Sequence, residues 1–337
     1  MNIKSLLIGS AAALAAVSGA QAADAIIAAE PEPVEYVRVC DAFGTGYFYI
    51  PGTETCLKVG GYVRVQLGFG EGTSERSDYD IFARGRLEVT AKNDTEYGTL
   101  TSVVRLRGHA SENNAGYDDN WTELEEGYID LAGFRVGKIY SWWDDDLFSE
   151  GDYLSNNTLF ASARYVFTGE AFSAGLSVDE LTWDNGTGAY DDANIGLTGM
   201  LSGAFGPVSA TLLGSYDFDY EEFAIRGIGS AELGPGTLSV AVAYASGENT
   251  YFNAAEWTVA ADYAFKVTDK LTIAPFGQYF WDYQLDSRIG DAWTVGLTAE
   301  YAVTEGLTAL ATVNYFDADD NNLNDSVTGF LRLQRDF

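Results

Sequence analysis

Residues 291–316 read DAWTVGLTAEYAVTEGLTALATVNYF, and their pattern is the clearest indication of the fold class. Apolar and polar residues alternate in steps of two on both sides of the short connection Thr304-Glu305-Gly306. The apolar positions are Trp293, Val295, Leu297, Ala299 and Tyr301 before the connection, and Leu307, Ala309, Ala311, Val313 and Tyr315 after it. A period of two over about ten residues is typical of a β-strand with one apolar and one polar face. We therefore predict an antiparallel β-hairpin here.

The same alternation recurs from Leu57 to Phe337. It predicts sixteen strands, at 57–70, 79–92, 97–110, 121–131, 134–142, 158–167, 171–182, 192–205, 207–218, 221–233, 236–246, 253–266, 270–284, 291–303, 306–316 and 325–337. The pattern is weakest in 221–233, which contains Gly227 and Gly229. An even number of strands returns both ends of the region to the same side of a membrane.

The connections between these segments alternate between tight and long. The tight ones are Asn93-Asp94-Thr95-Glu96, Ala132-Gly133, Thr168-Gly169-Glu170, Gly206-Pro207, Gly234-Pro235-Gly236, Val267-Thr268-Asp269 and Thr304-Glu305-Gly306, and the long ones are rich in Asp, Glu, Asn and Gly. An outer-membrane barrel has short periplasmic turns and long external loops, whereas a soluble sandwich has no reason to sort its loops by length. We predict an all-β fold, a transmembrane antiparallel β-barrel of 16 strands whose polar faces line a water-filled lumen.

Residues 1–22 have the parts of a secretory signal peptide: Lys4, an apolar run from Leu6 to Val17, and Ala20-Gln21-Ala22 at the cleavage position. No later stretch approaches the 18 continuous apolar residues of a membrane-spanning helix. We predict export to the outer membrane of a Gram-negative cell, with 1–22 as signal peptide, 23–56 as an N-terminal segment and 57–337 as the barrel.

The formal net charge is −31, from 19 Lys and Arg against 50 Asp and Glu. This excludes a nucleic-acid-binding protein, which needs a basic face. Two explanations of the acidity stay open, a solvated acidic surface and a concentration of acids in the long loops.

Aromatic residues make up 14% of the chain, and many lie within a few residues of the tight turns. These are Tyr97, Phe134, Phe167, Phe172, Phe205, Phe265 and Tyr301. They predict an aromatic girdle at one membrane boundary. The alternative is ordinary cross-strand aromatic pairs.

Cys40 and Cys56 are the only cysteines. In an exported chain such a pair favours a disulfide, which would close a loop of roughly 17 residues and contribute about 3 kcal/mol. With a single histidine elsewhere, their spacing matches no metal site, and we expect no metal and no cofactor.

Three stretches carry a family resemblance: MNIKSLL at 1–7, YVRVCDAFG at 36–44 continuing as YFYIPGTETCLKV at 47–59, and LQRDF at 333–337. They resemble the general porins of alphaproteobacteria, the Omp2-type group of Brucella and rhizobia. The resemblance implies a 16-stranded homotrimer in outer-membrane lipid and lipopolysaccharide that passes ions and small hydrophilic solutes, with its third loop folded inward. The third loop carries no matching motif, so its residues are assigned by position.

That third long loop begins WDDDLFSEGDYL at Trp143, and we take residues 143–157 as the constriction loop. Its acids are Asp144, Asp145, Asp146, Glu150 and Asp152, and Leu147, Phe148, Tyr153 and Leu154 would anchor it against a wall. The alternative is a solvated acidic loop like the one with Asp317, Asp319 and Asp320.

Five arginines in the first three strands share the lumen-facing parity: Arg64, Arg84, Arg86, Arg105 and Arg107. A basic wall opposite an acidic loop would place a transverse field across the pore and disfavour apolar solutes. These arginines could also pair with wall acids such as Glu88, Glu126 and Asp130. With the two charged sets similar in size, the acidic outer loops predict moderate cation selectivity.

Other functions remain as alternatives: a structural or adhesive barrel, or a sugar-specific channel. We expect no enzyme, because the single histidine, His109, lies two residues from Ser111 on one strand, a poor arrangement for a base and a nucleophile. The run at Asp317 lacks the Gly and Glu of an EF-hand, although bridging of loop acids by Mg²⁺ or Ca²⁺ stays open. Small outward residues, Gly85, Ser102 and Gly108, would let barrels approach closely in a trimer.

Overall fold

The computed structural model describes residues 38–70, 78–111, 120–156, 158–181, 194–319 and 325–337. The predicted signal peptide therefore lies outside the described residues. The chain divides into two compact units, Met1–Arg38 and Val39–Phe337, and all the strands described below lie in the second. No helix within the described ranges is long and apolar enough to cross a bilayer.

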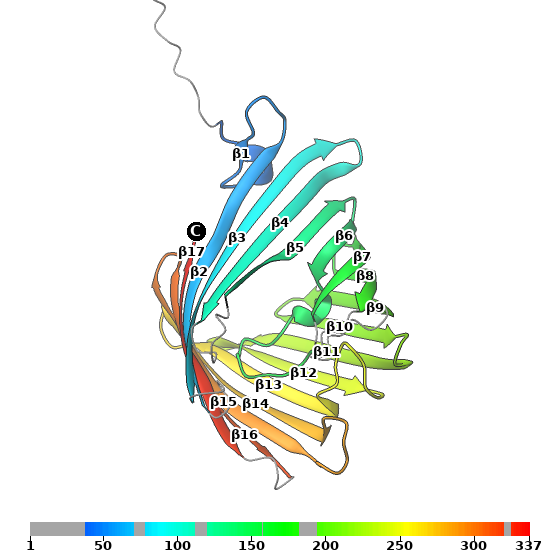
Figure 1. Ribbon diagram of the computed structural model, residues 1–337, viewed down its shortest axis with the longest axis vertical. Coiled ribbons are helices and arrows are strands. Elements are labelled where there is room, and N and C mark those ends of the chain that lie inside the picture. The colour runs from blue at the N-terminus through cyan, green and yellow to red at the C-terminus, as the bar shows by residue number, and fades with distance from the viewer. Residues whose placement is uncertain (1–37, 71–77, 112–119, 157, 182–193, 320–324) are drawn as a thin grey trace, which may run out of the picture. The chain divides into compact units, whose positions relative to one another are not determined.

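Within the described ranges, seventeen strands follow one another in chain order (Figure 1). They are β1 (Phe48–Tyr49), β2 (Cys56–Gly70), β3 (Tyr79–Thr95), β4 (Gly98–Ser111), β5 (Trp121–Leu131), β6 (Phe134–Tyr140), β7 (Leu159–Thr168), β8 (Phe172–Leu181), β9 (Asn194–Phe205), β10 (Val208–Asp217), β11 (Glu222–Leu233), β12 (Gly236–Ala245), β13 (Ala255–Lys266), β14 (Leu271–Tyr283), β15 (Ala292–Thr304), β16 (Leu307–Ala318) and β17 (Ser326–Asp336). Two short 3-10 helices are η1 (Asp41–Phe43) and η2 (Trp142–Asp144).

Each strand from β2 to β17 pairs antiparallel with its neighbours in sequence, and β17 pairs with β2. The sheet therefore closes into a barrel of 16 strands, as the sequence predicts. Closure leaves the barrel without an edge strand, the condition for a sheet to lie in lipid. The barrel end at Phe337 is held to β2 by two backbone hydrogen bonds with Gly61, of 3.0 and 3.1 Å.

All sixteen predicted segments are strands, with boundaries that agree to within a few residues. The segment with the weakest alternation is β11. Its glycines do not interrupt the strand, and every residue from Glu222 to Ala231 has a partner on β10. Two features differ from the expectation. The two-residue strand β1 pairs with the start of β2, and the connection of β10 to β11 spans only Phe218–Glu221, so not every connection at the loop end of the barrel is long.

The two faces of the strands differ as the alternation predicts. Val295 and Leu297 of β15 are 45% and 44% exposed, whereas Thr294 and Thr298 on the other face are buried. The apolar side chains thus point out toward lipid and the polar ones point inward.

Aromatic side chains lie on the outer surface near both ends of the strands. Tyr97, Phe134 and Phe205, beside the tight turns, are each at least 60% exposed. Toward the other end, Tyr244 packs on Trp257 with ring centroids 4.4 Å apart, and Trp293 packs on Tyr315 at 5.3 Å. A cross-strand pair also occurs beside a turn, where Phe134 faces Tyr165 at 4.6 Å.

Cys40 and Cys56 form the predicted disulfide, with their Cα atoms 6.0 Å apart. Both are buried together with Tyr47, and Cys40 N donates to Tyr47 O at 2.9 Å. The disulfide therefore ties the segment that precedes the barrel to the first residue of β2.

Candidate functional site

The third loop connects β6 to β7 and begins with η2. Ser141 caps this turn by accepting a hydrogen bond from Trp143 N at 3.2 Å. Trp143, Leu147 and Leu154 are buried. Phe148 and Tyr153, which we expected to act as anchors as well, are 37% and 50% exposed. The anchoring residues are therefore Leu147 and Leu154, which pack with Ala241 and Ala260 of the barrel wall.

The middle of the loop contacts the polar faces of distant strands. Ser149 N donates to Asp262 of β13 at 2.8 Å, and Glu150 N donates to Thr298 of β15 at 3.3 Å. Tyr153 exchanges two hydrogen bonds with Gln278 of β14, of 2.8 and 2.9 Å. The loop that leaves β6 therefore reaches β13 to β15.

Arg226 of β11 holds both ends of the loop. Its Nη1 donates to the carbonyl oxygens of Trp143 and Leu154 at 2.9 and 3.3 Å, and its Nη2 donates to that of Trp142 at 2.8 Å. The guanidinium lies 4.9 Å from the centroid of the Trp143 ring, and Arg226 is 1% exposed. The predicted basic residues do not include Arg226, although a lone arginine of polar-face parity in a glycine-containing strand is a signal.

A second connection, residues 246–254 between β12 and β13, packs against the third loop. Tyr251 is fully buried and donates to Asp179 at 3.0 Å, while its ring lies 6.0 Å from that of Trp143. Its carbonyl oxygen accepts from Asn156 N at 2.9 Å. Nothing in the strand alternation indicated this contact.

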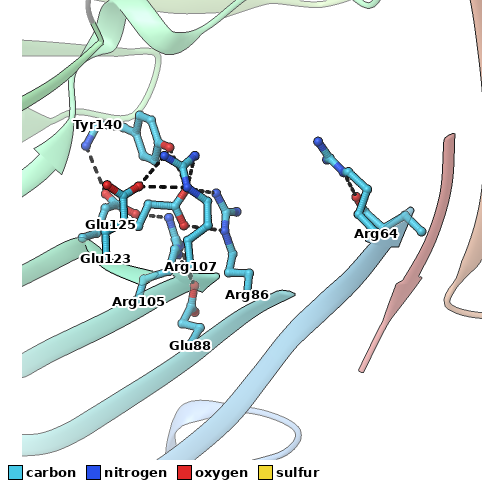
Figure 2. Close-up of polar contacts among 10 residues, drawn as sticks. Arg64, Arg86, Glu88, Arg105, Arg107, Glu123, Glu125 and Tyr140 are labelled. Atoms are coloured by element: carbon cyan, nitrogen blue, oxygen red, sulfur yellow. Dashed lines mark hydrogen bonds and ion pairs between the residues drawn. The ribbon is translucent and has the colours of Figure 1, made fainter. Parts of the chain in front are cut away.

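The strand register brings the predicted basic residues onto one face. Arg64 lies directly opposite Arg84, and Arg86 lies opposite Arg107. Three of the five arginines are neutralised by glutamates of the wall: Arg86 pairs with Glu125, Arg105 with Glu88 and Glu126, and Arg107 with Glu123 and Glu125. Figure 2 shows this cluster on β3 to β5, with Arg64 apart from it.

A β-bulge in β5 makes the cluster possible. The register with β4 skips from Arg105 opposite Glu126 to Leu106 opposite Leu124, which leaves Glu125 as the extra residue. Glu125 and Glu126 are consequently both buried on the same side, against the alternation. Glu125 accepts two hydrogen bonds from Arg86, of 2.6 and 2.5 Å, and one from Tyr140 at 2.7 Å. A bulge of this kind re-aims side chains and cannot be read from a period of two.

Arg64 and Arg84 make no ion pair within the described residues. Arg64 Nε donates to Gln334 at 2.8 Å, and the Arg84 guanidinium lies 5.2 Å from the Phe82 ring. Glu150 pairs with Arg332 of β17 through hydrogen bonds of 2.6 and 3.0 Å. Arg332 is not among the predicted site residues, because β17 lies beside β2 only when the barrel closes.

The surroundings of Asp144, Asp146 and Asp152 disfavour the charged forms of these carboxyl groups. The pKa of Asp146 is raised to about 7, first because the protein displaces water around it and second because Asp152 and Asp144 carry like charge; Arg226 opposes this only in part. The pKa of Asp152 is raised to about 6, mainly by burial, although Leu147 N donates to it at 3.2 Å. Nearby protein atoms also displace part of the water around Asp144 and raise its pKa, although the residue remains exposed.

His109 packs between aromatic rings: its ring stacks on Trp121 at 5.3 Å and lies 4.7 Å from Phe82. Ser111 donates to Asp80 at 3.0 Å. Among the residues that the structure describes, no group of three or more His, Cys, Asp or Glu side chains is placed to hold a metal ion.

The chain is similar to known outer-membrane proteins over its full length. A family model described as a porin subfamily matches residues 24–332. The chain is 49% identical to the putative outer membrane protein y4fJ of Sinorhizobium fredii, over 100% of this chain and 99% of that protein. It is 46% identical to outer membrane protein IIIA of Rhizobium leguminosarum bv. viciae, over 98% of this chain and 93% of that protein.

It is also 35% identical to porin Omp2b of Brucella neotomae, over the full length of both. Among solved structures, the outer membrane channel DcaP of Acinetobacter baumannii superposes with a TM-score of 0.67 at 11% identity, covering 86% of this chain and 99% of that one. At this identity the likeness concerns the fold alone.

Proposed function

Because the chain belongs to the porin subfamily, we propose that its channel passes ions and small hydrophilic solutes by passive diffusion, with a moderate preference for cations. The protein is an outer-membrane β-barrel of a Gram-negative cell. Its relatives are porins, which are channels rather than enzymes.

We propose that the third loop, residues 143–157, forms the constriction. The observation that carries this proposal is the set of hydrogen bonds from Ser149, Glu150 and Tyr153 to the polar faces of β13, β14 and β15. A loop that leaves the wall at β6 and bonds to inward-pointing side chains of these distant strands would cross the lumen between them.

The charges along this path support a weak preference for cations. The Arg86, Arg105 and Arg107 cluster holds three bases against four glutamates, and Arg332 is paired with Glu150. Asp144 and Asp145 are exposed and face no ion-pair partner within the described residues. The acidic outer loops add a field that reaches about 8 Å at physiological salt, raising the local cation concentration.

The test is the reversal potential of single channels in a KCl gradient. Changing Asp144→Asn, Asp145→Asn and Asp146→Asn together should shift it toward anions and alter the conductance, with folding intact. A matched control removes three acids from the exposed tight turns instead, by Glu96→Gln, Asp269→Asn and Glu305→Gln. If the loop variant keeps wild-type selectivity and conductance, the constriction assignment is wrong. A barrel that conducts no current would have a structural or adhesive role.

A further inference from the structure

A pocket of about 300 Å³ lies between the start of the third loop and the barrel wall formed by β4 to β7. The wall contributes Arg105, Arg135 and Arg164, and the loop contributes Asp144 and Asp145. Positively and negatively charged side chains therefore line the same small pocket.

Two of the three wall arginines already have carboxylate partners. Arg105 pairs with Glu88 and Glu126, and Arg135 pairs with Asp130 at 2.8 Å. Arg164 lies directly opposite Arg135 in the register but makes no ion pair within the described residues. Its Nη1 donates to the carbonyl oxygen of Tyr140 at 3.0 Å, and its guanidinium lies 5.3 Å from the centroid of a Trp142 ring.

The acids on the loop side are likewise unneutralised. Asp144 and Asp145 are exposed, and no ion pair joins either of them to Arg164 or to another base in the part of the chain that the structure describes. Separated charges of opposite sign across a small pocket match a solute that carries both charges itself. The guanidinium, held over the Trp142 ring, offers a carboxylate a flat pair of donors.

We propose that this pocket binds small zwitterions of the free amino-acid class, with the solute carboxylate on Arg164 and its ammonium group on Asp144 and Asp145. Its volume is at the lower end of small-molecule sites, which favours a solute of amino-acid size over an oligosaccharide. The inference rests on the proposed function, because the solute reaches the pocket through the channel.

The experiment measures K⁺ current through single channels in a planar bilayer while L-serine is added. L-serine has no net charge at neutral pH, so it changes the current only by occupying the path. We expect a saturable decrease in current with L-serine and none with glycerol. Arg164→Gln should raise the half-blocking concentration about threefold, the size expected for one solvent-exposed ion pair.

Arg288→Gln is the control, because it removes the same charge from an arginine that does not line this pocket, whose side chain is 88% exposed and already paired with Asp286. Its half-blocking concentration should stay at the wild-type value. If Arg164→Gln does not assemble, Asp145→Asn at the exposed loop position replaces it, with the same expected rise. Equal shifts in the two arginine variants, or an absence of saturable block in the wild type, would overturn the inference. A wild-type protein without any K⁺ current would instead contradict the proposed function.

Discussion

Arg226 is a buried arginine whose hydrogen bonds go to backbone carbonyl groups rather than to carboxylates. It binds Trp142 and Trp143 at the start of the third loop and Leu154 near its end, so one side chain joins the two ends of the loop. Hydrogen bonds from a charged group contribute about 1.5–3 kcal/mol each, so the three bonds from Arg226 attach the loop base firmly to β11.

Substituting Arg226 should therefore loosen the loop without opening the barrel. We expect the single-channel current to fluctuate between several conductance levels in Arg226→Gln and in Arg226→Lys, whereas the wild type conducts steadily. Arg226→Lys keeps the positive charge but lacks the planar guanidinium that donates to several carbonyl groups at once. Arg288→Gln, at an arginine whose side chain is 88% exposed, is the control and should conduct as steadily as the wild type. Steady currents in both Arg226 variants would show that other contacts hold the loop.

Should the Arg226 variants fail to assemble, hydrogen exchange of the wild type gives the answer. A loop held at both ends should exchange its amides at 147–154 far more slowly than the connection at 284–291. Equal exchange in the two connections would contradict the role given to Arg226.

The third loop is attached to the barrel wall and also carries carboxyl groups that titrate near neutral pH. The carboxyl groups of Asp146 and Asp152 have pKa values raised to about 7 and about 6, so both lose charge as the pH falls through this range. Raised values mean that the folded loop favours the neutral acids. The resulting contribution to folding stability is fully present below a pH of about 3.9, the ordinary pKa of an aspartate in the unfolded chain. It is lost as the pH rises through the folded pKa values of about 6 and about 7.

We accordingly expect cation selectivity to decline between pH 8 and pH 5. The groups that face these acids are Asp144, Asp145, Asp262 and Arg226, of which the arginine keeps its charge throughout. Reversal potentials measured across this range should show a transition near pH 6–7, and Asp146→Asn with Asp152→Asn should remove it. A transition of unchanged size in the double variant would assign the titration to other groups.

For the whole molecule, we propose that barrels contact one another in a trimer through the outer surface of β2 to β5. Small residues there, Ala83, Gly85, Gly108 and Ala110, line a concave patch together with Val63. A Cβ atom added at Gly85 would meet no atom within 4 Å, and one at Gly108 would make only ordinary contacts. Larger side chains at these positions are therefore compatible with the single barrel.

We predict that Gly85→Leu with Gly108→Leu yields folded monomers, because the added side chains block the close approach of a second barrel. Native mass spectrometry after gentle extraction should detect trimers for the wild type and monomers for this variant. Gly214→Leu, on the outward face of β10 with equally open surroundings, is the control and should stay trimeric. Monomers in the wild-type sample would contradict the proposed trimer.

The features that depend on local alternation and on residue type could be predicted from the sequence. A period of two forces one face of each segment toward lipid and the other toward water, so all sixteen barrel strands, including the glycine-containing β11, could be placed from the residues alone. The disulfide followed from two cysteines in an exported chain. The lumen-facing parity of Arg64 and Arg84 followed from the same period.

Which charged side chains contact one another could not be predicted from the sequence, because these contacts form only in the folded barrel. Arg332 reaches Glu150 because barrel closure brings the last strand beside the first, and Arg226 reaches the third loop from a strand more than 70 residues away. The bulge at Glu125 turns two consecutive glutamates inward and neutralises arginines that the alternation alone would leave as a basic wall. These contacts depend on closure and on a break in register, and neither leaves a periodic signal in the sequence.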